Sequence, residues 1–216
     1  MKLYRLFFAV FWLMSGITAR AEGDVALITA LEGKVNRIID GGVSKMEPFV
    51  KLKVGDVLNT TKNSQVQITY FENGRQESWS GAGKLEIMQT ESNSTDLSPP
   101  RVKQIPLIIV KRLARTPSLD SQGRAGVMRL RAIPSPEEIV SINETYNKMR
   151  AESALDDLSP ELYFLAGMFE LKQFNEVAEK INQLNKNHPK NNQVKVLVSL
   201  YNRAIRNTLN ARTNNK

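Results

Sequence analysis

The hydrophobic periodicity of the chain changes once, near residue 135, and this change separates two kinds of structure. From residue 24 to 88, apolar residues alternate with polar ones or form short runs divided by glycines, which is typical of β-strands. Beyond Ser135, apolar residues recur at the spacing of amphipathic helices. The sequence therefore predicts an α+β protein in two parts, an N-terminal all-β sandwich or barrel-like domain followed by a small all-α helical bundle.

The clearest strand is the alternating stretch 65–70, in which Val66, Ile68 and Tyr70 occupy every second position. Successive side chains of a strand point to opposite faces, so these three should lie on the core side of a sheet. Asn73-Gly74 follows, and this dipeptide is a strong signal for a tight hairpin turn. The sequence thus predicts a hairpin here.

The second half of the β region is less regular. Residues 89–100 are polar and end in two prolines, which indicates a loop. Two further strands are predicted, Val102–Lys111 and Gly126–Arg131, with an exposed loop between them. We assign both to one β domain spanning 22–133.

Two Ser-Pro dipeptides mark helix starts, at Ser135-Pro136 and Ser159-Pro160, because proline is favoured in the first turn of a helix. Asn187-His188-Pro189 should end a later helix. These signals predict a helical domain over 134–209 and a frayed polar tail over 210–216. The apolar faces expected for its later helices are Leu162, Leu165, Ala166 and Phe169; Val177, Ala178, Ile181 and Leu184; and Val194, Leu197, Tyr201, Ala204 and Ile205.

The first 21 residues have the layout of a secretory signal peptide. Lys2 and Arg5 precede an apolar run of about 12 residues, and Ala19-Arg20-Ala21 provides small residues at a cleavage site. The alternative is an uncleaved membrane anchor, but a spanning helix needs about 20 apolar residues. We expect cleavage near Ala21 and a periplasmic location, with no transmembrane segment in the mature chain.

Composition limits the chemistry of the chain. It has no cysteine, which excludes disulfides, thiolate metal sites and cysteine nucleophiles. The formal net charge is +8, and removing residues 1–21 leaves +5. Eight basic residues lie between Arg101 and Arg131, with Asp120 as the one acid. Such a segment can attract an anionic partner, although a solvated surface gives the same pattern.

Four segments between Ala26 and Met88 follow one another in a distinctive order: Leu31-Glu32-Gly33-Lys34-Val35, Val54-Gly55-Asp56-Val57-Leu58-Asn59-Thr60, Val66-Gln67-Ile68-Thr69-Tyr70-Phe71-Glu72-Asn73-Gly74-Arg75 and Trp79-Ser80-Gly81-Ala82-Gly83. This order resembles the FecR domain family. The best-known members of that family are transmembrane regulators that signal from the periplasm to a cytoplasmic sigma factor. This sequence departs from them, because no cytoplasmic segment precedes its apolar run. The resemblance implies a periplasmic β domain more directly than a regulatory role.

Residues 160–189 look like one tetratricopeptide-type helical hairpin. The positions that carry this resemblance are Leu162, Ala166-Gly167, Phe169, Phe174, Ala178 and Pro189. Repeats of this type need about three copies for a continuous core. Any amphipathic helical hairpin would share much of the pattern, so both interpretations stay open.

The sequence shows no catalytic constellation. His188 is the one histidine, which leaves no triad or zinc site to assemble around it. Gly81-Ala82-Gly83-Lys84 lacks the first half of a phosphate-binding loop and indicates a tight connection between strands. Trp79 and Tyr70 could stack on a sugar or a peptide, but aromatic residues on strands usually belong to the core. We therefore expect no enzyme activity, no cofactor and no metal.

Three functions remain open on the sequence. The first is a non-enzymatic periplasmic binding or scaffold protein, whose partner is an envelope protein or an anionic cell-wall or membrane component, and not nucleic acid. The second is a FecR-type sensor acting through a separate membrane partner, and the third is a glycan hydrolase using carboxylates alone. The residues expected to contact a partner are Lys111, Arg112, Arg115, Arg124, Arg129, Arg131, Tyr163, Phe169 and Phe174.

Overall fold

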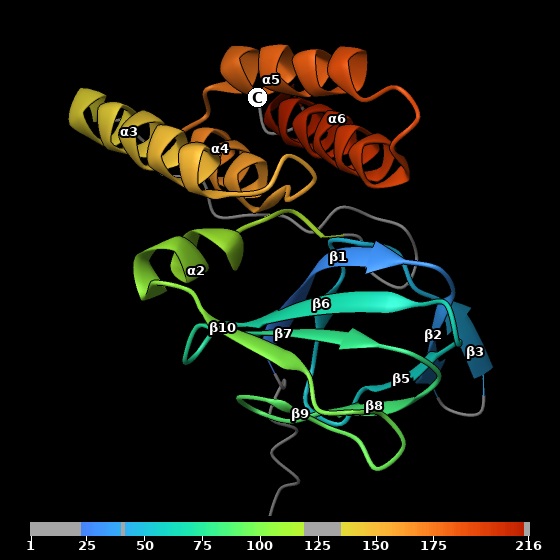
Figure 1. The fold of residues 1–216 in the computed structure, drawn as a ribbon. Coiled ribbons are helices and arrows are strands. Elements are labelled where there is room, and N and C mark those ends of the chain that lie inside the picture. Colours follow the sequence, from blue (N-terminus) through green and yellow to red (C-terminus); the bar gives the residue numbers. More distant parts are fainter. Residues whose placement is uncertain (1–22, 40–41, 119–134, 214–216) are drawn as a thin grey trace, which may run out of the picture.

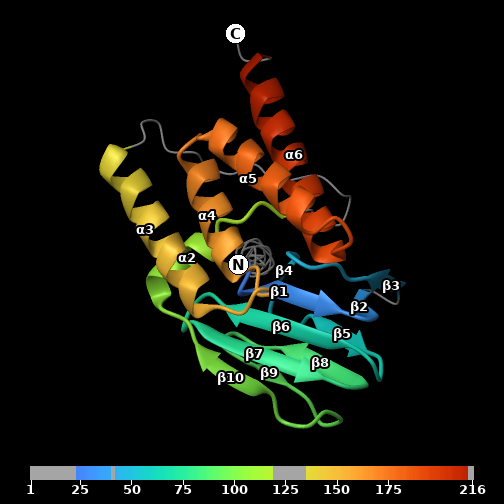
Figure 2. The ribbon, with the colours of Figure 1, turned by 45° about the horizontal axis from the view of Figure 1, so that its top comes forward.

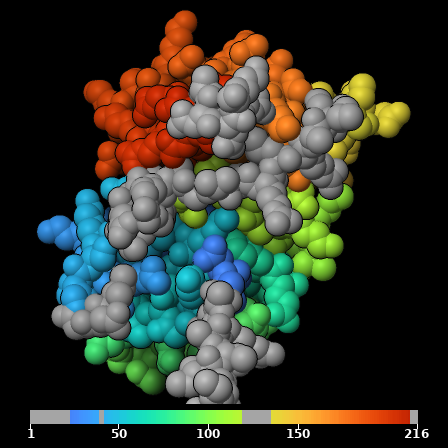
Figure 3. All heavy atoms as spheres, turned by 180° about the vertical axis from the view of Figure 1, so that it is seen from behind, coloured from blue at the N-terminus to red at the C-terminus, as the bar shows by residue number. Residues whose placement is uncertain are grey.

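The fold consists of two β-sheets followed by a layer of helices, as seen in a computed structural model that describes residues 23–39, 42–118 and 135–213 (Figure 1). The helices cover one face of the first sheet, and the second sheet lies against its other face. Figure 3 shows the helical part, yellow to red, above the β part from the opposite side. The predicted α+β organisation in two parts is confirmed.

In the part of the chain that the structure describes, each sheet contains five strands, and all paired neighbours are antiparallel. The first sheet has the order β10-β7-β6-β1-β4, formed by Arg101–Gln104, Arg75–Ser80, Gln65–Tyr70, Ala26–Glu32 and Lys51–Leu52. The second has the order β3-β2-β5-β8-β9, formed by Gly42–Lys45, Val35–Ile39, Val57–Thr60, Gly83–Ile87 and Ser92–Asn93. The predicted connection at Gly81-Ala82-Gly83 carries the chain from one sheet to the other.

The alternation of β6 has the predicted consequence. Val66, Ile68 and Tyr70 are buried in the core between the two sheets. Trp79 of β7 lies in the same core, as its residue type suggested. The strand alternation therefore supplies the apolar interior of the sandwich.

Strand β1 is buried on both faces. Ala26 and Ile28 belong to the core between the sheets, whereas Leu27 belongs to the core that contains the helices. Phe49, from the segment before β4, joins Leu27 in that helical core. A strand that is covered on both sides explains why residues 25–28 form a continuous apolar run.

The helical layer contains α3 (Pro136–Glu152), α4 (Ser159–Glu170), α5 (Phe174–Asn187) and α6 (Asn192–Thr213). Figure 2 shows α4 between α3 and α5. Every residue of α4 is buried, including Glu161 and Glu170. The prediction of one buried apolar face therefore accounts for only part of the buried surface of this helix. Because α4 is surrounded, it is the central element of the helical part.

The predicted strand Val102–Lys111 is wrong beyond Gln104, where β10 ends and helix α2 (Leu107–Leu113) follows Pro106. Val110 and Leu113 are buried three residues apart, which is a helical spacing. A short β-branched run is compatible with a strand or a helix, and here the segment is helical and packs against α4. The predicted strand Gly126–Arg131 lies outside the described residues.

Smaller boundaries also differ from the expectation. The predicted loop 89–100 contains the two-residue strand β9, and α6 continues to Thr213 instead of fraying from Asn210. Helix α5 begins at Phe174. The helix end at Asn187 before His188-Pro189 is confirmed.

The Asn73-Gly74 hairpin provides a test of this fold. Gly74 has a φ of 72°, and a Cβ atom there would overlap the carbonyl oxygen of Ile105. Gly55 has a similar φ of 81°, but no atom lies within 4 Å of a Cβ there. We expect Gly55→Ala to lower the free energy of unfolding by about 1–2 kcal/mol through backbone strain alone. Gly74→Ala should cost about 2–5 kcal/mol, because overpacking adds to the strain.

Urea unfolding followed by circular dichroism measures both losses. Equal losses for the two alanine variants would contradict the close approach of β10 to this turn.

Candidate functional site

Part of the basic segment predicted to face a partner forms ion pairs within the molecule. Lys111 is exposed on α2, but Arg112 and Arg115 turn toward the helical layer and form ion pairs with Glu170, at 2.9 and 2.6 Å. Arg112 also pairs with Glu138 at 3.3 Å. These two arginines therefore join α2 to α3 and α4, and their guanidinium groups are committed to that role.

The remaining basic residues separate into two groups. Arg124, Arg129 and Arg131 lie outside the described residues. Arg101 and Lys103 lie on β10, are exposed, and have no ion pair among the residues that the structure describes. These two cations are thus available to a partner. The sequence places them in the basic segment, but they were not among the residues predicted to contact a partner.

Two of the three aromatic residues predicted for the helical hairpin are buried, and the third is partly buried. Tyr163 and Phe169 are buried, and Phe174 packs against the ring of Phe169 with centroids 5.4 Å apart. The rings of Tyr163 and Phe169 are therefore unavailable at the surface, whereas Phe174 keeps part of its surface exposed. The α4–α5 hairpin is present, but two of its three predicted contact residues point into the core.

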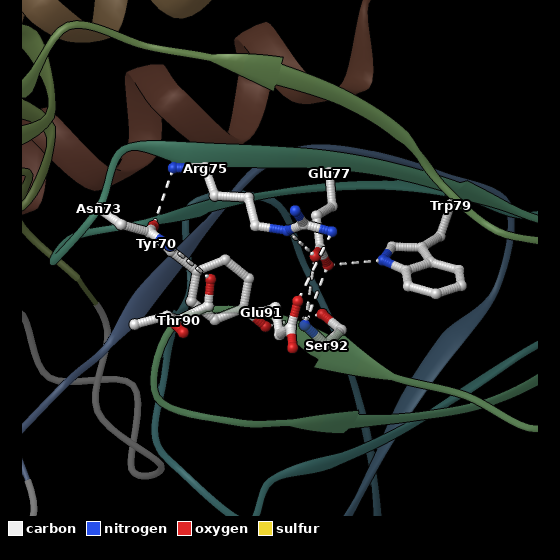
Figure 4. Close-up of polar contacts among 8 residues, drawn as sticks. All are labelled: Tyr70, Asn73, Arg75, Glu77, Trp79, Thr90, Glu91 and Ser92. Carbon is white, nitrogen blue, oxygen red and sulfur yellow. Dashed lines mark hydrogen bonds and ion pairs between the residues drawn. The ribbon is translucent and has the colours of Figure 1, made fainter.

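A buried carboxylate lies at the edge of the sandwich (Figure 4). Glu77 of β7 has a fully buried side chain and accepts hydrogen bonds from Arg75 Nε at 2.6 Å and Trp79 Nε1 at 2.9 Å. The backbone N–H of Ser92 contacts both carboxylate oxygens, at 3.1 and 3.3 Å. Because β7 and β9 belong to different sheets, Glu77 links the two sheets.

Tyr70 extends the same network. Its hydroxyl and that of Ser92 are 2.7 Å apart in the interior. Burial raises the pKa of Tyr70 above its ordinary value, despite the hydrogen bond to Ser92. The hydrogen bond to Glu77 raises the pKa of Arg75. The phenol of Tyr70 is therefore neutral and the guanidinium of Arg75 is charged, and both lie near the carboxylate of Glu77.

This network has the features of a structural element. The carboxylate of Glu77 already accepts several hydrogen bonds, and buried polar groups that are satisfied in this way fix a core in one arrangement. A catalytic carboxylate instead needs room for a substrate within hydrogen-bond reach. Glu77 borders neither of the clefts described below.

A second ionic cluster joins three helices. Glu161 of α4 accepts hydrogen bonds from Arg150 of α3 at 2.9 Å and from the Tyr146 hydroxyl at 3.3 Å. Lys180 of α5 contacts that hydroxyl at 2.5 Å and lies 4.3 Å from the centre of the Tyr146 ring. Each polar group thus pairs within the cluster, which holds α3, α4 and α5 together.

Other carboxylates lie outside these two clusters. Glu72 accepts a hydrogen bond from Gln89, Glu86 is exposed, and Asp157 accepts one from the backbone of Ser159. Among the described residues, no group of three or more histidine, cysteine or acidic side chains is placed to hold a metal ion.

Two clefts open between the first sheet and the α3–α4 connection. The larger has a volume of about 620 Å³, and its polar lining includes Gln67, Ser78, Arg101, Asp156 and Asp157. Amide, hydroxyl and charged groups of this kind recognise polar ligands through hydrogen bonds.

The second cleft, of about 480 Å³, is more apolar and lies next to the first. It includes Ile108 of α2 and Met149 of α3, with Lys103 and Lys148 as cations, and it also borders Asp157. We call the two clefts together the junction groove. Sequence reasoning missed it, because its walls come from β7, β10, α2 and the α3–α4 connection, which are far apart in the chain.

Comparison with protein-family models, with curated proteins and with solved structures gave no match for this chain. The resemblances to the FecR domain and to a tetratricopeptide hairpin therefore stay predictions from the sequence. No described helix has the length and apolar character needed to span a bilayer.

The Glu77 network makes a stability prediction. Glu77→Gln removes the charge while keeping the shape, so it should lower the free energy of unfolding by about 2–3 kcal/mol through weaker charge-assisted hydrogen bonds. The matched control is Glu86→Gln on β8, an exposed position that should change stability by less than about 0.5 kcal/mol. Urea unfolding measures both, and similar small losses would show that Glu77 does not stabilise the sandwich.

Proposed function

We propose that this protein is a non-enzymatic binding or scaffold protein of the bacterial envelope. Its β sandwich acts as a FecR-like domain in the periplasm, and its helices form a small tetratricopeptide-like unit fixed to it. The partner is an envelope protein or another envelope component that binds at the junction groove.

Support for the location comes from the sequence. The N-terminal pattern of a basic start, an apolar run and Ala19-Arg20-Ala21 is that of an export signal. A chain without cysteines has to hold its fold by packing, and the two apolar cores do so. Both features suit an exported protein of the bacterial periplasm.

The single observation that carries the proposal is the junction groove. The groove lies between the β sandwich and the helical layer. These two parts are held together by the packing of Leu27 and Phe49 in the helical core and by the ion pairs of Glu170. Binding sites commonly lie at the boundary between such units, since rigid walls reduce the entropy lost on association. The buried charges at Glu77, Glu161 and Glu170 pair inside the fold, which favours binding over chemistry at these positions.

Site-specific photocrosslinking in cells tests this function. We would place p-benzoylphenylalanine at Ser80, an exposed position bordering the larger cleft, and at Glu144, an exposed position on α3, as the matched control. The proposal predicts one dominant envelope product at Ser80 that is absent at Glu144. Equal products at both positions, or none at Ser80, would contradict binding at the groove.

A further inference from the structure

Strand β10 is an open edge of the first sheet. Its four residues are exposed, and within the described ranges β7 is the one strand paired with it (Figure 2). An edge strand presents unpaired N–H and C=O groups that another chain can join by adding a strand. The side chains along β10 determine which kind of strand can pair with it.

The register shows which backbone groups face outward. The N–H of Ile105 donates to the carbonyl oxygen of Gly74 at 2.9 Å, so this pair bonds across the β10–β7 ladder. In an antiparallel pair, bonded and non-bonded positions alternate. Lys103 and Arg101 therefore also bond toward β7, and the backbone groups of Val102 and Gln104 point to the open edge.

Successive side chains of β10 point to opposite faces of the sheet, and the basic residues lie on one face. Arg101 and Lys103 are opposite Ser78 and Gln76 of β7, and each borders one cleft of the junction groove. Val102 is opposite Glu77 on the other face of the sheet and is 49% exposed. The edge thus reads basic, apolar, basic along three successive residues.

We propose that β10 binds an extended segment of a partner protein in which acidic, apolar and acidic residues follow one another. Directly opposite side chains of paired strands lie about 5 Å apart, where opposite charges attract. The acidic residues would lie beside Arg101 and Lys103, and the apolar residue beside Val102. This inference rests on the proposed function and names the chemistry of the partner.

Two other features bear on the charge of the occupant. A second copy of β10 would bring its own arginine and lysine beside these cations, and the repulsion disfavours self-pairing. Glu152 at the end of α3 and Asp156 and Asp157 of the α3–α4 connection also border the groove and would favour a basic occupant instead. We assign the greater influence to Arg101 and Lys103, because their side chains would be the immediate neighbours of an added strand.

Fluorescence anisotropy with labelled octapeptides tests the proposal. The probe is a peptide with glutamate, valine and glutamate at its centre and threonines around them, and the control peptide has lysines in place of the glutamates. The glutamate peptide should bind the full-length protein about tenfold more tightly than the lysine peptide. The double variant Arg101→Glu, Lys103→Glu should reverse that preference.

Two variants separate strand addition from general charge attraction. Val102→Pro removes an outward N–H without removing a bond to β7, and it should abolish binding, whereas Val102→Ala should retain it. Lys190→Glu with Lys195→Glu changes two exposed cations elsewhere and should leave the affinity unchanged. Circular dichroism verifies that each variant is folded.

Tighter binding of the lysine peptide, or equal binding to the proline and alanine variants, would overturn the proposal. If no peptide binds while the Ser80 crosslink is formed, the groove has a different partner, and the charges of β10 serve to protect the edge from aggregation. If the Ser80 crosslink also fails, the proposed function itself is wrong.

Discussion

The whole arrangement depends on the attachment of the helical layer to the first sheet. Leu27 is the point at which β1 enters the helical core, and Phe49 joins it from the segment before β4. Glu170, buried at the end of α4, pairs with Arg112 of α2 and with Arg115 just beyond that helix, because an unpaired buried carboxylate would cost several kcal/mol. Apolar burial supplies the attraction, and the ion pairs fix one orientation.

This attachment determines which surfaces remain open. The helices cover the middle of the first sheet, so the free surface is found toward β10, where the α3–α4 connection overhangs the sheet side chains. Arg112 and Arg115 hold the layers together, whereas Arg101 and Lys103 stay exposed at the edge. The basic segment therefore has two roles, and position in the fold separates them.

The two-part organisation could be predicted from the sequence because it depends on local periodicity. The alternation of Val66, Ile68 and Tyr70 and the turn at Gly74 are properties of a few neighbouring residues. The helix at Leu107–Leu113 and the complete burial of α4 could not be predicted in this way, since both depend on packing between distant segments. The junction groove was missed for the same reason.

The most direct test of the attachment is equilibrium unfolding in urea with two probes. In the chain without residues 1–21, Trp79 is the one tryptophan, so its fluorescence reports on the sandwich, and far-UV circular dichroism reports mainly on the helices. We expect coincident transitions with one midpoint, because Leu27 and Phe49 of the β part complete the helical core and would be exposed if the two layers separated. Two separate transitions would show that the helical layer folds independently of the sheet, and would contradict the shared core at Leu27.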